Sequence, residues 1–130
     1  MGVAEWGLNM DRWEAQYAFW SSFGVPAYEV NSVPDADEVS FPYITYEAAS
    51  AGFDGNVLIN PSIWTSSTSW LTADSLADLI ESRLKNGGEI VAYDGGAIWI
   101  TAEDPFAQNM GDPDDDRIKR KVLSVTLHFS

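Results

Sequence analysis

The sequence predicts an α+β domain in which a mostly antiparallel sheet of about four to five strands carries two helices on one face. Two amphipathic helical patterns and several short apolar runs indicate this class. So does the Asp94-Gly95 step between two apolar runs, because Asp-Gly supplies the positive φ angles of a two-residue hairpin turn. We expect a single domain over residues 11–130, and a frayed N-terminus over residues 1–10, which have no periodicity.

The first helix is expected from Arg12 to Phe23. Asp11 precedes it as an N-cap, and Glu14 lies three positions further on, which is the spacing of a capping box. Aromatic residues at helical spacing predict the buried stripe of this helix. Its members are Trp13, Tyr17 and Trp20, with Phe19 and Phe23 beside them. Gly24 and then Pro26 end the helix in the usual order.

Two strands and a second helix should follow. The strands are expected over residues 41–49 and 57–65, and the second is broken at Asn60-Pro61 because proline cannot donate to a β-ladder. The helix is expected to be capped by Thr72 and stopped by the Asn-Gly-Gly step at 86–88. Its buried stripe is predicted to be Leu76, Leu79, Ile80 and Leu84.

The C-terminal third is expected to hold a hairpin, a long acidic loop and a final strand. The hairpin strands are residues 89–93 and 97–101. The loop is expected over residues 103–117, which contain two Asp-Pro steps and a run of acids without periodicity. The final strand, residues 118–129, alternates apolar and polar side chains. Its core-facing residues are predicted to be Leu123, Val125, Leu127 and Phe129.

Composition excludes several classes of function. The formal net charge of −13 disfavours capture of nucleic acids or anionic membranes. The chain has no cysteine, so disulfides and thiolate chemistry are excluded. It has neither a signal-peptide pattern nor an apolar run approaching the roughly 20 residues that span a bilayer. We therefore expect a soluble protein made in a cytoplasm.

The sequence contains no recognisable catalytic or metal motif. The only histidine is His128, and there is no Gly-x-Ser-x-Gly elbow or phosphate-binding glycine loop. The Asp-x-Asp-x-Asp pattern in residues 112–116 resembles the start of a calcium loop. It then has Arg117 where glycine is needed and Leu123 where a bidentate glutamate is needed. We expect no catalytic residues, no cofactor and no metal.

Five segments carry a resemblance to a known group of proteins. They are residues 12–28, Phe41-Pro-Tyr-Ile-Thr-Tyr46, Ile63-Trp64 with Ser69-Trp70, residues 87–100, and residues 105–116. Together they resemble the small tail-terminator or minor tail (tail-completion) proteins of tailed bacteriophages and prophages. The resemblance spans about residues 11–129 and rests on turn and packing motifs, with no catalytic residue to carry over.

This resemblance implies a structural virion protein of the tail, assembled in the bacterial host cytoplasm. Such a subunit would form a hexameric ring that ends the tail tube and contacts the tail-tube and head–tail connector proteins. DNA would pass through its lumen without being bound, and no membrane partner is implied. Six copies would carry six times −13, or −78, formal charges, which suits a channel that must not retain DNA.

The acidic loop and the basic start of the last strand are the expected interface with other subunits and tail proteins, since segments of opposite charge suit docking. The candidate residues are Phe106, Met110, Asp114, Asp115, Asp116, Arg117, Arg120 and Lys121. Among them, Phe106 and Met110 would anchor the loop as an arm that becomes ordered on a partner.

Two other classes remain open. A carbohydrate-binding module could stack sugars on exposed aromatic side chains, with Trp64, Trp70 and Trp99 as the platform. An enzyme that uses a pair of carboxylates is the third possibility, although none of the twenty acids is singled out by its spacing.

Overall fold

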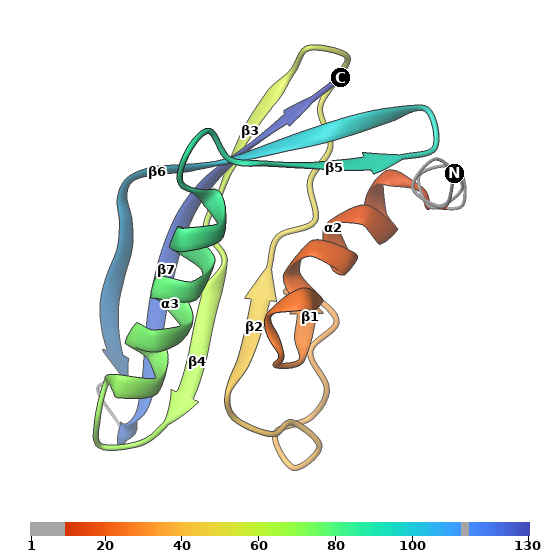
Figure 1. The fold of residues 1–130 in the computed structure, drawn as a ribbon. Helices are drawn as coiled ribbons and strands as arrows, with labels where there is room; N and C mark the ends of the chain where they lie inside the picture. The colour runs from red at the N-terminus through yellow and green to blue at the C-terminus, as the bar shows by residue number, and fades with distance from the viewer. Residues whose placement is uncertain (1–9, 113–114) are drawn as a thin grey trace.

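A computed structural model describes residues 10–112 and 115–130. They form one mixed sheet of seven strands, curled into a half-barrel, with two short helices (Figure 1). In chain order the elements are α2 (Arg12–Trp20), the 3-10 turn η1 (Ser21–Phe23), β1 (Ala27–Glu29), β2 (Tyr43–Tyr46), β3 (Asn56–Ile59), β4 (Ser62–Ser66), α3 (Leu71–Leu84), β5 (Glu89–Tyr93), β6 (Gly96–Asp112) and β7 (Asp115–Phe129). The predicted α+β fold with four to five antiparallel strands is therefore wrong.

The sheet is organised around β7. This strand pairs antiparallel with β6 along one edge, and with β3 and then β4 along the other. The expected break at Asn60-Pro61 is confirmed, because it divides one long strand into β3 and β4. Pro61 has no N–H to give, yet its carbonyl accepts the Leu123 N–H at 2.7 Å, so the break stays attached to β7.

Two elements account for the wrong fold class. The three residues of β1 pair in parallel with β2, and a strand so short has no readable periodicity. The acidic loop predicted over 103–117 is also wrong, because β6 continues to Asp112 and β7 begins at Asp115. An irregularity in the β6–β7 register contributes to this error: residues 103–106 lie opposite Ser124 alone, so Pro105 stands outside the regular ladder.

The concave face of the sheet holds the core. Leu123, Val125, Leu127 and Phe129 are buried on it, as predicted, and they belong to one cluster with Trp20 of α2 and Ile80 of α3. The predicted Asp94-Gly95 turn is also confirmed, because it joins β5 to β6 and Gly95 has a φ of 99°. Helices and sheet thus bury a shared apolar layer.

The predicted face of α2 is partly wrong. The capping box of Asp11 and Glu14 is present, but Trp13 and Tyr17 are exposed. Gln16 is buried in their place. Its side-chain amide donates to the Ala49 carbonyl at 2.9 Å and accepts the Ala49 N–H at 3.0 Å. This pair of hydrogen bonds satisfies the buried amide and fixes the rotation of the helix.

The predicted face of α3 is rotated in the same way. The helix begins at Leu71 after Trp70, whose side chain makes no capping bond, so the predicted Thr72 cap is wrong. Ile80 and Leu84 are buried as expected, whereas Leu79 is exposed. The remaining buried positions of the helix are Ala73 and Ala77. Alanine lets the helix approach the sheet closely, which a count of large apolar residues does not detect.

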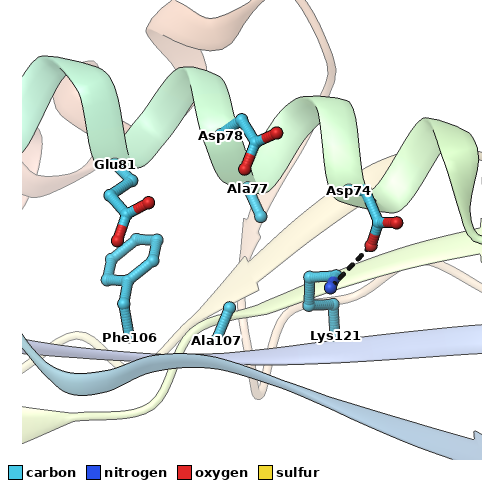
Figure 2. Close-up of a pocket in the computed structure, with 7 residues that line it drawn as sticks. All are labelled: Asp74, Ala77, Asp78, Glu81, Phe106, Ala107 and Lys121. Carbon is cyan, nitrogen blue, oxygen red and sulfur yellow. Dashed lines mark ion pairs between the residues drawn. The ribbon is translucent and has the colours of Figure 1, made fainter.

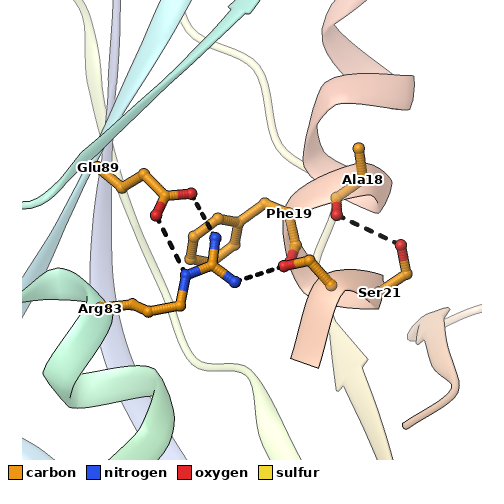
Figure 3. Close-up of polar contacts among 6 residues, drawn as sticks. Ala18, Phe19, Ser21, Arg83 and Glu89 are labelled. Carbon is orange, nitrogen blue, oxygen red and sulfur yellow. Dashed lines mark hydrogen bonds and ion pairs between the residues drawn. The ribbon is translucent and has the colours of Figure 1, made fainter. Parts of the chain in front are cut away.

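Arg83 ties both helices to the sheet (Figure 3). Its guanidinium donates to both carboxylate oxygens of Glu89 in β5, at 3.2 and 2.6 Å, and to the Ser22 hydroxyl at 2.7 Å. The same group lies over the Phe23 and Phe19 rings, 4.5 and 5.3 Å from their centroids. A planar, five-donor cation suits this site better than an ammonium does.

We expect Arg83→Lys to lower the free energy of unfolding by about 1–2 kcal/mol, because lysine loses the bidentate contact and the ring stacking. Urea denaturation followed by tryptophan fluorescence measures this. Arg12→Lys is the matched control: that guanidinium also lies over a ring, Trp13, but at 5.6 Å and at the surface, so the cost should stay below about 0.5 kcal/mol. Equal costs would mean that Arg83 has no special role.

Candidate functional site

The predicted interface residues do not form one surface. Phe106 and Lys121 face α3 on the concave side of the sheet (Figure 2). Met110 and Arg120 form a cross-strand pair of β6 and β7 whose side chains point to the outer face. The structure therefore separates the two apolar anchors, and it divides the basic run between the two faces.

The remaining candidates lie around the tip of the β6–β7 hairpin. The Asp115 side chain accepts the Arg117 N–H at 2.9 Å and lies 3.9 Å from the Arg117 guanidinium. The Asp116 carbonyl accepts a hydrogen bond from the Lys119 ammonium. Asp114 lies outside the described residues. These charged side chains thus contact one another within the tip, whereas the predicted docking on another subunit stays a prediction.

Lys121 lies at the floor of a groove between α3 and β6, which we call the acidic groove (Figure 2). The groove has a volume of about 440 Å³, and its lining residues are Asp74, Ala77, Asp78, Glu81, Phe106, Ala107 and Lys121. Lys121 is only 9% exposed, and its ammonium lies 2.7 Å from the Asp74 carboxylate. This near-buried cation is neutralised by its neighbour, so it is held within the subunit.

Arg120 is held on the opposite face. Its guanidinium lies over the Trp64 ring at 5.0 Å and donates to the Ser62 hydroxyl at 3.0 Å. Trp64 also stacks on Tyr43, with ring centroids 6.3 Å apart. Burial, and then repulsion from Tyr28, raise the pKa of the Tyr43 phenol, so it stays neutral at physiological pH. Trp64 is therefore enclosed by intramolecular contacts.

The three tryptophans of the proposed sugar platform lie apart. Trp64 lies opposite Arg120 and Trp99 opposite His128 on the same face of the sheet. These two positions are eight residues apart on β7, which corresponds to about 26 Å at the rise of a strand. Trp70 lies near Lys121, on the concave side. A single saccharide-stacking surface needs neighbouring rings, so this arrangement weighs against the carbohydrate alternative.

His128 has a partner on each ring nitrogen. Nε2 lies 2.9 Å from the Thr101 hydroxyl, and Nδ1 lies 2.9 Å from the Asn56 side-chain oxygen. This sequence of hydroxyl, imidazole and amide matches the order of nucleophile, base and orienting group in a hydrolase. The three side chains nevertheless lie on the open outer face, with the Trp99 ring centroid 4.5 Å from the imidazole. A cross-strand packing contact accounts for the arrangement.

The outer face carries an exposed apolar surface that the sequence did not predict, and we call it the outer patch. It consists of Leu58 on β3, Ile90 on β5 and Trp99 on β6, with exposed fractions of 60%, 70% and 43%. Ile90 pairs with Trp99, and Trp99 pairs with His128, so these side chains form one cross-strand row. Leu58 pairs with Thr126, two residues from His128 on β7, so it lies diagonally to that row. Alternation within each strand places these residues outward, but only the register brings them together.

A second apolar surface lies on the helical side of the sheet, and we call it the apolar groove. It has a volume of about 420 Å³, and its lining residues are Val25, Pro42, Leu71, Thr72, Ser75, Leu76 and Leu79. Leu71 and Leu79 are exposed. The sequence assigned Leu79 to the core because helical periodicity cannot tell a buried stripe from an apolar surface beside it.

Among the described residues, three acids of one loop lie close enough together to gather around a cation. Carboxylate oxygens of Asp35, Asp37 and Glu38 lie within 4.8 Å of one another, and all three residues are exposed.

Within residues 10–112 and 115–130, no helix combines the length and the apolarity needed to cross a bilayer. A scan against protein-family models and a search of curated proteins found no match to the chain.

We expect Asp74→Asn to lower the free energy of unfolding by about 1–3 kcal/mol, because it leaves the near-buried Lys121 ammonium without its carboxylate. Asp78→Asn, one helical turn further on, is the matched control. Among the described residues Asp78 has no cationic partner, so its change should stay within about 0.5 kcal/mol. Thermal and urea denaturation would report the difference, and similar losses for both variants would contradict it.

Proposed function

We propose that this protein is a structural subunit that assembles with copies of itself into a hexameric ring at the end of a phage or prophage tail tube. The observation that carries the proposal is the presence of two different exposed apolar surfaces, the outer patch and the apolar groove. The patch lies on the sheet face away from the helices, and the groove borders α3 on the other side.

Two unlike surfaces favour a head-to-tail contact. In such a contact the patch of one subunit enters the groove of the next, and a repeated rotation closes into a ring. The side chains are suited to this: Ile90 and Leu58 project from the sheet, whereas Leu71 and Leu79 border a hollow. Contiguous apolar side chains exposed on a surface mark contact sites when they are not scattered singly.

The tail location rests on the sequence resemblance and on charge. The turn and packing motifs of residues 11–129 resemble those of tail-terminator and minor tail proteins. A ring of six subunits would carry −78 formal charges, which would keep a phosphate backbone from binding to the wall of a lumen. Contacts with the tail tube and the head–tail connector then follow from the position of the ring.

A structural role also suits the chemistry of the described residues better than catalysis does. His128 lies on an open face, and the acidic groove contains one lysine that is already paired with Asp74. A general base is expected within reach of a substrate that is held in a cleft. We therefore propose no reaction for this chain.

The ring predicts a particle of six subunits, or about 86 kDa from six times 14.3 kDa. Light scattering after size exclusion and negative-stain images should show this particle, or an equilibrium that shifts toward it with concentration. Ile90→Glu should abolish assembly by placing a charge in an apolar contact. Tyr17→Glu alters another exposed side chain, on α2 and outside both surfaces, and should leave the ring intact. A strictly monomeric protein would refute the proposal.

A mixing experiment tests the head-to-tail geometry. Ile90→Glu damages only the patch, and Leu79→Glu damages only the groove, so each variant alone should be monomeric. An equimolar mixture retains one intact contact between unlike subunits and should form dimers that cannot grow further. Dimers of Leu79→Glu alone would instead indicate a symmetric patch-to-patch contact.

A further inference from the structure

Strand β6 has a long edge that the described part of the chain leaves uncovered. β5 pairs only with residues 96–100 of β6, whereas β7 pairs with β6 as far as Asp112. No strand within residues 10–112 and 115–130 lies on the other side of β6 beyond Ile100 (Figure 1). An open edge of this kind can accept a further strand.

The register identifies the free backbone groups of this edge. Leu123 gives its N–H to the Pro61 carbonyl, on the side of β7 away from β6, and it pairs with Ala107. Paired residues of an antiparallel ladder alternate between exchanging hydrogen bonds and pointing away from each other. Ala107, Asn109 and Gly111 therefore point their N–H and C=O groups away from β7, toward the open side.

The acidic groove lies directly beside this edge. Ala107 and Phe106 form its floor, and α3 supplies three acids along its opposite wall (Figure 2). Lys121 neutralises Asp74, but Asp78 and Glu81 have no cationic partner among the described residues. A strand added to β6 would thus meet two unpaired carboxylates on one face.

We propose that this edge is the docking site for an extended basic segment of a partner protein, which adds to β6 as a further strand. Backbone hydrogen bonds at Ala107, Asn109 and Gly111 would hold the segment, and alternate lysine or arginine side chains would face Asp78 and Glu81. Strand addition of this kind combines backbone affinity with side-chain selection. The complementary charges would select the partner and speed its association.

A second copy of this chain does not supply such a segment. Its basic run, residues 117–121, belongs to β7, where residues 118–121 pair with β4 on one side and residues 119–121 pair with β6 on the other. The occupant must therefore be a different protein. The ring proposed above uses other surfaces, so the docking site stands or falls independently of it.

The probe is a fluorescent peptide of alternating lysine and valine, with binding followed by anisotropy at low and physiological salt. The Asp78→Asn, Glu81→Gln double variant should weaken binding about tenfold at low salt. Asp35→Asn with Asp37→Asn removes the same charge from an exposed loop and should leave binding unchanged. Equal weakening by both pairs would overturn the proposal, because it would show attraction to net charge alone.

The strand geometry is tested at Asn109. Asn109→Pro removes an N–H that serves no bond to β7, so the subunit should fold while peptide binding is lost. Asn109→Ala keeps the N–H and should bind as the wild type does. Equal binding by both variants would overturn strand addition. In the wild type, bound peptide should also protect the Ala107, Asn109 and Gly111 amides from hydrogen exchange, and unchanged exchange at all three would contradict the site.

Discussion

The pairing of β7 on both of its edges is the constraint on which the rest of this structure depends. β7 joins β6 to β3 and β4, so the half-barrel has a single continuous strand at its centre. Its odd-numbered residues from Leu123 to Phe129 supply the apolar layer against which both helices pack. A register slip of one residue would expose that whole layer, so the core and the hydrogen-bond ladder specify the same alignment.

The same alignment determines what the surface can do. The bulge between Ala102 and Ala107 shifts the β6–β7 register and divides β6 into two parts. The first part pairs with β5 and carries Trp99 onto the outer face, whereas the second part leaves one edge free beside α3. A bulge of this kind bends a strand and re-aims its side chains. One local irregularity thus places an apolar patch and an open edge at different positions on one subunit.

Sequence reasoning predicted the features that depend on neighbouring residues. The capping box at Asp11, the Asp94-Gly95 turn, the break at Pro61 and the alternation of the last strand each have a local cause. It failed where tertiary contacts decide the outcome. The buried Gln16 rotates α2, and no apolar pattern marks that residue. Asp104-Pro105 contributed to the predicted loop over 103–117, although an irregularity in the register accommodates Pro105 within β6.

The candidate surfaces were harder to predict for a related reason. The outer patch needs the pairing of Ile90 with Trp99, which is a long-range property of the sheet register. Arg120 and Lys121 are adjacent in sequence and were assigned to one interface. Strand alternation places them on opposite faces, one over Trp64 and the other beside Asp74. Adjacent charged residues in a strand therefore do not predict one charged surface, because successive side chains point to opposite faces of the sheet.

The positive charges of this protein are largely used within the subunit. Arg83 is held by Glu89, Lys121 by Asp74 and Arg120 by the Trp64 ring. Such contacts satisfy the cations locally, whereas the protein has twenty acids and only seven lysines and arginines. None of the acids whose burial the structure describes is buried, so their negative charge faces solvent. A surface of this kind repels polyanions at short range and attracts basic segments, and screening confines both effects to about 8 Å at physiological salt. Selective docking then requires that a few acids adjoin a shaped site, as Asp78 and Glu81 adjoin the edge of β6.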